Sequence, residues 1–143
     1  MIPEQERIRE LISEAGEHTL FTGGASDDDI ATLEDRLGVR LPYSYRWFLK
    51  DYGYGGVDGV TTLGIGKNGV QVSERVTKDH RAIGLPMNLV VVENCDEWQY
   101  CLDTAAGDAD DCPVVSWEFG DLRPEYPSFY TYLIERYTQH MNA

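Results

Sequence analysis

Apolar residues recur along this chain at two spacings, and the first spacing is helical. Residues three and four positions apart share one face of an α-helix, so this recurrence predicts helices with one buried side. Together with flanking proline, serine and glycine residues, it predicts five helices: between Pro3 and Gly16, from Ser26 to Leu37, between Pro42 and Gly53, from Val72 to Arg81, and from near Ser128 through Tyr137. The fourth helix competes with a strand that would begin at Val70, and its later charged positions favour the helix.

The second spacing is that of β-strands, which are rich in β-branched and aromatic residues. The strands are predicted within Val57 to Ile65 (one or two short strands), Leu89 to Val92, Trp98 to Asp103 and Pro113 to Trp117. Alternation within the third of these segments places Trp98, Tyr100 and Leu102 on an apolar face and the residues between them on a polar face. The turn before it predicts a hairpin with the Leu89 to Val92 strand.

Two segments are predicted to lack regular structure. Glu17 to Ala25 reads as a loop whose Leu20 and Phe21 reach the core, and Glu118 to Pro127 reads as an irregular connection. The resulting order of helices, strands and a final helix predicts an α+β fold. We expect a mainly antiparallel sheet of about four to six strands, with N-terminal helices and a C-terminal helix packed on it. A length of 143 residues fits a single domain, 1–143.

The chain carries a large excess of acidic residues, 25 against 12 basic ones, for a net charge of −13. The segment from Glu93 to Glu125 holds ten of these acids and a single base, Arg123. Such a field repels nucleic acid and anionic membranes, and it attracts a basic protein by long-range steering. The alternative is that the acidic surface only keeps the protein in solution.

Residues for catalysis or metal binding do not form a recognised motif. The three histidines lie outside any Ser/His/Asp or Cys/His pattern. Asp108 to Asp111 begins like a calcium loop but lacks the later glycine and glutamate. The cysteines, Cys95, Cys101 and Cys112, lack zinc-module spacing and fit reduced thiols. We therefore expect no catalytic residues, metal or cofactor. A charged N-terminus without a long apolar run predicts a cytoplasmic protein.

The stretch from Leu33 to Gly56 contains a set of leucine, aromatic, proline and glycine residues at fixed spacing: Leu37, Gly38, Leu41, Pro42, Tyr45, Phe48, Leu49, Gly55 and Gly56. These residues resemble the N-terminal signature of the SUKH superfamily, which includes fungal cell-wall synthesis regulators and bacterial immunity proteins of polymorphic toxin systems. One departure is Tyr54, which stands where an asparagine often precedes the glycines. The later strands and the last helix follow in the order of the family, so the resemblance covers nearly the whole chain and implies the same α+β class.

Together, resemblance and charge imply a non-enzymatic immunity protein that neutralises a cognate toxin, such as a nuclease, by protein–protein association. The alternatives are a scaffold or regulatory module of the cell-wall-regulator type and a small-ligand-binding domain. The expected partner face joins the acidic segment to the loop after the third helix, although the aromatic residues there would serve equally to seal the sheet. Its predicted residues are Tyr54, Asp58, Glu93, Asp96, Glu97, Asp103, Asp108, Asp110, Asp111, Glu118 and Asp121.

Overall fold

The chain folds into five α-helices and seven strands within residues 2–141, the part that our computed structural model describes; side chains are described for residues 2–139. The helices are α1 (Pro3–Ala15), α2 (Asp27–Leu37), α3 (Tyr43–Asp51), α4 (Val72–Arg81) and α5 (Phe129–Met141), with the short 3-10 turns η1 (Gly16–His18) and η2 (Lys67–Gly69). The strands are β1 (Thr19–Phe21), β2 (Gly55–Val57), β3 (Val60–Thr62), β4 (Leu89–Asn94), β5 (Gln99–Asp103), β6 (Val114–Glu118) and β7 (Asp121–Tyr126).

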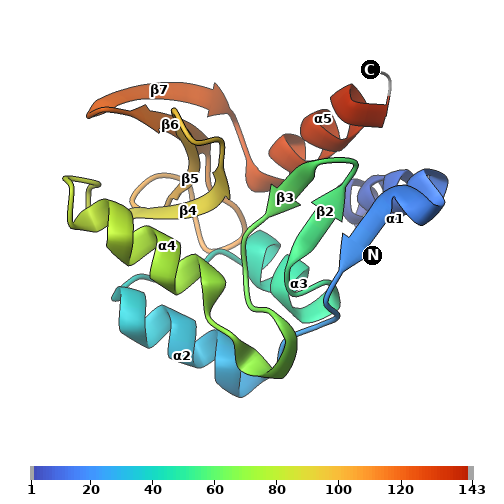
Figure 1. Cartoon of the computed structure of the whole chain (residues 1–143), viewed down its shortest axis with the longest axis horizontal. Coiled ribbons are helices and arrows are strands. Elements are labelled where there is room, and N and C mark those ends of the chain that lie inside the picture. The colour runs from blue at the N-terminus through green and yellow to red at the C-terminus, as the bar shows by residue number, and fades with distance from the viewer. Residues whose placement is uncertain (1, 142–143) are drawn as a thin grey trace.

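The strands form two antiparallel sheets, which Figure 1 shows side by side. One has the order β1-β2-β3 and the other the order β4-β5-β6-β7. A backbone hydrogen bond of 2.7 Å from the Leu63 amide to the Val92 carbonyl links the end of β3 to β4. The predicted α+β class is confirmed, and the strands are divided between two sheets.

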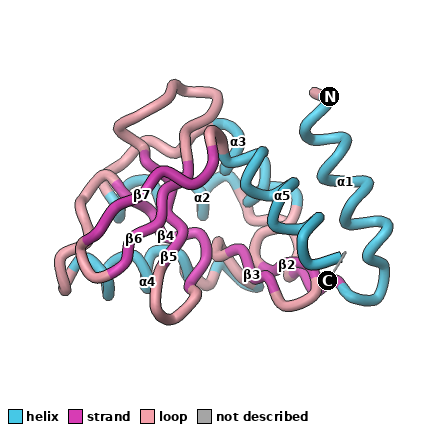
Figure 2. The backbone as a smooth tube through the Cα atoms, turned by 90° about the horizontal axis from the view of Figure 1, so that it is seen from above, coloured by secondary structure: helices cyan, strands magenta, loops and turns pink. Residues whose placement is uncertain are grey.

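Helices α1 and α5 pack against each other at the N- and C-terminal ends of the chain (Figure 2). Their buried faces follow the predicted periodicity, with Ile8 and Leu11 of α1 and Phe129 and Leu133 of α5 in one apolar core. Within residues 2–141, no helix combines the length and the apolar character needed to cross a membrane.

The turn between α2 and α3 is held by the residues of the sequence signature. Ser26 caps α2, because its hydroxyl accepts a hydrogen bond from the Asp29 amide. At the other end Gly38 has a φ of 69°, the left-handed conformation that terminates a helix and favours glycine. The Glu34 carboxylate then accepts a hydrogen bond of 2.9 Å from the Leu41 amide, which fixes the direction in which the chain enters α3.

Ser44 and the signature residue Tyr45 fasten α3 to the rest of the molecule. Ser44 is buried and donates from its hydroxyl to the Asp111 carboxylate at 2.8 Å, while the buried Tyr45 hydroxyl donates to the Leu63 carbonyl at 2.8 Å. Gly56 lies in the middle strand β2, where a Cβ atom would run into the Val60 carbonyl of β3. These contacts fasten α3 to the loop between β5 and β6 and to the residue that follows β3, and Gly56 allows β2 and β3 to lie close together.

Helix α4 covers the outer edge of β4 (Figure 1). The Ser73 hydroxyl donates to the Val91 carbonyl at 3.1 Å, and the Val91 amide donates to the Thr77 hydroxyl at 3.0 Å. All three residues are buried, so these hydroxyls satisfy strand groups that would otherwise have no partner. This edge of the sheet is thus closed to another strand.

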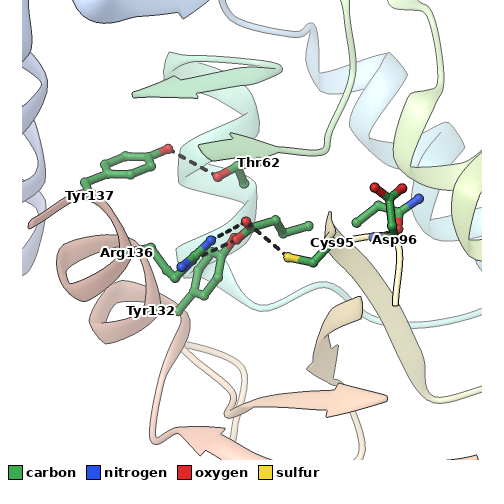
Figure 3. A network of polar contacts seen from close by, with 8 residues as sticks. Thr62, Cys95, Asp96, Tyr132, Arg136 and Tyr137 are labelled. Atoms are coloured by element: carbon green, nitrogen blue, oxygen red, sulfur yellow. Dashed lines mark hydrogen bonds and ion pairs between the residues drawn. The ribbon is translucent and has the colours of Figure 1, made fainter. Parts of the chain in front are cut away.

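A buried polar network joins α5 to β4, as Figure 3 shows. The Glu93 carboxylate accepts hydrogen bonds from the Tyr132 hydroxyl at 2.7 Å and from two nitrogens of Arg136 at 3.1 and 2.6 Å. Burial raises the pKa of the Tyr132 hydroxyl well above its ordinary value, and the negative charge of Glu93 raises it further. Burial works against the charged form of Arg136, but the hydrogen bonds and charge of Glu93 raise its pKa overall. One turn further along α5, the Tyr137 and Thr62 hydroxyls are hydrogen-bonded at 3.2 Å.

Four predictions about local structure were wrong. The segment from 17 to 25, expected to be a loop, contains the strand β1, which pairs with β2. The segment from 118 to 127 contains the edge strand β7, which Gly120 allows to turn back along β6. Leu20 is 80% exposed, because the pleat of β1 points it away from the core. In β5, Gln99 and Cys101 are buried although they belong to the predicted polar face, because α4 and α5 cover opposite faces of this sheet.

Candidate functional site

The predicted acidic residues lie in two groups at opposite ends of the four-stranded sheet. Strand pairing places Asn94, Gln99 and Trp117 at one end, with the β4–β5 and β6–β7 turns. The 104–112 loop, which joins β5 to β6, leaves the sheet at the other end. The first end carries Asp96, Glu97, Glu118 and Asp121, and the second carries Asp103, Asp108, Asp110 and Asp111. The segment from 93 to 125 therefore does not present one continuous face.

Glu93 does not belong to either group. It is only 5% exposed, and its carboxylate is fully engaged by the Arg136 and Tyr132 side chains described above. Glu93 was predicted to contact a partner, but its side chain is not accessible at the surface of the folded chain. The physical cause is the β-bulge between Val91 and Glu93, which breaks the strand alternation just before this residue.

The acidic residues of the second end hold the loop and two helix ends together. The Asp111 carboxylate accepts from the Ser44 hydroxyl and from the Phe129 amide at the start of α5. Asp103 accepts from the Asn88 side chain at 2.8 Å. The Asp108 carboxylate accepts from two amides of its own loop, and these hydrogen bonds lower its pKa. Asp110 is exposed. Most of the negative charge at this end therefore has a structural use.

Tyr54 and Asp58 lie in and beside the three-stranded sheet. Tyr54 is half-buried and packs on a small apolar cluster that includes Trp117 and Leu85. Asp58 is exposed at the turn between β2 and β3, where it has a φ of 44°. These two residues border a shallow hollow with Leu20 and do not line the acidic cleft described next.

The end of the sheet with the β4–β5 and β6–β7 turns contains a cleft of about 400 Å³. Trp117 forms its buried floor, with the His80 ring set edge-on to the indole at a centroid distance of 6.1 Å and an angle of 84°. Ile83, from the turn after α4, and Phe119, from the β6–β7 turn, line its sides and are 72% and 89% exposed. Apolar surface is thus freely accessible at this position.

Two acidic residues also line this cleft. Asp96 and Glu97 come from the β4–β5 turn, and both are exposed. Among the described side chains, neither carboxylate forms an ion pair or accepts a hydrogen bond, and the same holds for the nearby Glu118. Asp121 differs, because Arg123 of the same strand pairs with it at 3.1 Å. The cleft consequently joins an apolar floor to a negatively charged rim.

Phe119 stands at the tip of a two-residue turn that places its side chain in solvent. Glu118 and Asp121 are paired across the hairpin, and Phe119 and Gly120 between them have φ values of 50° and 87°. Two positive φ values define a type I′ turn, in which asparagine and glycine are the favoured residues. A bulky side chain in the left-handed region is a genuine outlier, and strain of this kind is concentrated at functional sites.

The cysteines and potential metal ligands do not form a reactive centre in the described residues. Burial raises the pKa of the Cys101 and Cys112 thiols to about 12. Burial, together with the charge of Glu93, also raises the pKa of Cys95 to about 12. Among the side chains of residues 2–139, no three His, Cys, Asp or Glu residues are grouped so that they could hold a metal ion.

The comparisons identify the family in agreement with this architecture. The fold and the α2–α3 signature place the molecule in the SUKH superfamily. The chain belongs to the SUKH_5 family, described as SMI1-KNR4 cell-wall, whose model matches residues 5–138. A solved structure titled "Crystal structure of protein from Pseudomonas syringae pv. tomato" is similar with a TM-score of 0.67 and 19% identity, over 90% of this chain and 93% of that one. At this identity the likeness concerns the fold alone.

Sequence reasoning located part of this cleft and missed the rest. It selected Asp96 and Glu97 because of their charge. It missed His80, which reaches the cleft from α4, and Ile83, which reaches it from the turn after α4. Nothing in the local sequence pattern indicates that this helix lies beside the β4–β5 turn. The sequence did contain one indication of the cleft, the pair Phe119-Gly120, because a large apolar residue beside the glycine of a turn is expected to be exposed.

Proposed function

We propose that this protein is a non-enzymatic, cytoplasmic immunity protein that neutralises a cognate toxin by binding it. The observation that carries the proposal is the cleft between the two turns, where exposed apolar side chains adjoin carboxylates that pair with no cation among the side chains of residues 2–139. Protein–protein contacts are strongest where an apolar centre is surrounded by a polar rim. The family relationship supports a protein-binding role of this kind.

The net charge of −13 favours a basic partner. A nuclease toxin fits this requirement, because it needs lysine and arginine residues for its own phosphate contacts. The unpaired carboxylates of Asp96, Glu97 and Glu118 would speed its capture, and the bound immunity protein would then occlude its substrate. Nucleic acid and anionic membranes are unsuitable partners for a surface of this charge.

A scaffold role is the second candidate, and the description of the family as SMI1-KNR4 cell-wall favours it. In that case the same cleft would recruit host proteins that have no toxic activity. The two roles differ in what happens to a cell that makes the partner alone. A toxin kills such a cell, whereas a host protein does not.

The test begins with co-purification of the tagged protein from its native lysate at low and at raised salt. Each basic protein recovered is then produced in a heterologous host, alone and together with this protein. The proposal expects one partner that stops growth when it is produced alone and is harmless in the presence of this protein. Recovery of host proteins that are harmless when produced alone would contradict the immunity role and favour the scaffold.

A further inference from the structure

We propose that the cleft between the β4–β5 and β6–β7 turns receives an arginine side chain of the partner protein. This inference rests on the proposed function only in assuming that the partner is a basic protein. It adds a specific chemistry, because it assigns the guanidinium group to the carboxylates of Asp96 and Glu97 and the rest of the side chain to the apolar walls.

The walls of the cleft suit the body of an arginine side chain. Its aliphatic stem packs on apolar surface, as the stems of long cationic side chains do in folded proteins. Ile83 and Phe119 offer such surface on the two sides of the cleft, and Trp117 lies at its floor. Contact with the stem would cover the most exposed of these residues, Phe119.

The charges of the cleft suit the head group. A guanidinium ion is planar and delocalised, so it can stack on an aromatic ring while its N–H groups bind a carboxylate, and an ammonium ion cannot combine these contacts as well. Asp96 and Glu97 supply the carboxylates, which have no cation partner among the described side chains. Arg81, at the end of α4, does not line the cleft, and one of its terminal nitrogens donates to the Met87 carbonyl at 2.8 Å.

The backbone supports the assignment independently of charge. Phe119 occupies a left-handed position where asparagine or glycine would be unstrained, and its ring is 89% exposed. Phe119 therefore buries little surface in the fold, and its left-handed backbone conformation is unfavourable for a bulky residue. Asp96 also has a positive φ, of 65°, which aspartate tolerates, and it lines the cleft from the β4–β5 turn.

The test uses the full chain, uniformly labelled with ¹⁵N, and a capped Gly-Arg-Gly peptide as the probe. The same peptide with citrulline in place of arginine is a neutral control of nearly equal shape. We expect the arginine peptide to bind with a dissociation constant on the order of millimolar, which suits a single side chain. The shifted signals should be those of the cleft, including the Trp117 indole N–H and the backbone amides of Asp96, Glu97 and Phe119.

Two sets of variants locate the binding. Asp96→Asn with Glu97→Gln removes the charge, and Phe119→Asn removes the ring; asparagine tolerates the left-handed backbone in each turn, so both variants should fold. Each set should weaken the arginine peptide at least about fivefold. The matched controls are Asp110→Asn, an exposed acid at the other end of the sheet, and Leu20→Thr, an exposed apolar residue of β1, and neither should alter binding.

Three results would overturn the proposal: no cleft shifts at about 50 mM peptide, equal shifts with the citrulline peptide, or binding unaffected by both cleft variants. Shifts produced by spermidine and not by the peptide would assign the cleft to a small polycation instead.

Failure of the proposed function is separable from these results. A toxin still neutralised by Phe119→Asn and Asp96→Asn/Glu97→Gln would leave the immunity role intact and exclude the cleft from it. Peptide binding without any toxin partner would retain the arginine site and exclude the immunity role.

Discussion

Replacement of Arg136 by methionine should destabilise the protein far more than the loss of any surface ion pair. The side chains of Arg136 and Glu93 are only 14% and 6% exposed, and they form two hydrogen bonds with each other. In Arg136→Met the Glu93 carboxylate stays buried with the Tyr132 hydroxyl as its remaining strong partner. Removal of one partner of a buried ion pair costs about 3–5 kcal/mol. For a chain of this length each kcal/mol lowers Tm by roughly 4 °C, so a fall of roughly 12–20 °C follows.

The assay is urea denaturation followed by tryptophan fluorescence, with thermal unfolding as a second measurement. The double variant Glu93→Gln/Arg136→Met leaves no buried charge, and it should recover most of the stability lost by Arg136→Met. Arg7→Met serves as the matched control, because Arg7 pairs with Glu10 in solvent and its loss should cost less than about 1 kcal/mol.

The reasoning would be refuted by a loss below about 1 kcal/mol in Arg136→Met, since the pair would then behave like a surface one. A double variant less stable than Arg136→Met would contradict the claim that an uncompensated charge causes the loss. A change in the denaturant slope, rather than the midpoint, would indicate an altered unfolded state and not a broken network.

Three further predictions concern the cleft, the thiols and the covered edge of β4. Phe119→Asn should raise the free energy of unfolding by about 1 kcal/mol, because asparagine suits the left-handed turn, and a destabilised variant would contradict the strain described there. Cys95 should react with iodoacetamide at pH 8 about a thousand times more slowly than a free cysteine, since its pKa is raised to about 12 and few molecules carry the thiolate; alkylation at the ordinary rate would refute this. Thr77→Val should cost about 1–3 kcal/mol in urea denaturation, because the buried Val91 amide loses its acceptor, and an unchanged midpoint would show that this amide finds another partner.

The helices were predictable from the sequence because their signals are local. Ser26 and Gly38 bound α2 through capping and left-handed geometry that depend on neighbouring residues only. The bounds of α4 were also predicted, although Gln71 makes no capping hydrogen bond and the buried Ser73 and Thr77 are held by the distant strand β4.

The division of the strands between two sheets was not predictable, because it depends on pairings between distant segments. β1 has three residues, and it becomes a strand only because β2 lies beside it. β7 is exposed along nearly its whole length, so it lacks the apolar alternation that marks a half-buried strand. A local hydrophobic pattern indicates which residues are buried, and few residues of β1 and β7 are buried.

The candidate site was predictable in charge and not in shape. Acidic composition selected Asp96 and Glu97, which are exposed, but it selected Glu93 equally, and the partners of Glu93 come from α5. Nor can it show that Asp111 caps α5 and binds Ser44. The acidic residues divide into an end whose carboxylates are mostly unpaired and an end whose carboxylates hold the fold together, and this division exists only once the sheet has formed.

The most direct test of the central claim is the rate at which a purified partner toxin associates with two matched charge variants. Asp96→Asn/Glu97→Gln removes two charges at the cleft, and Asp108→Asn/Asp110→Asn removes two at the other end while sparing Asp111, which the fold requires. We expect the cleft variant to associate about tenfold more slowly at low salt and with a flatter salt dependence, while the second variant behaves like the parent protein. Unchanged association in the cleft variant, with slowed association in the other, would contradict the account and place the interface at the 104–112 loop.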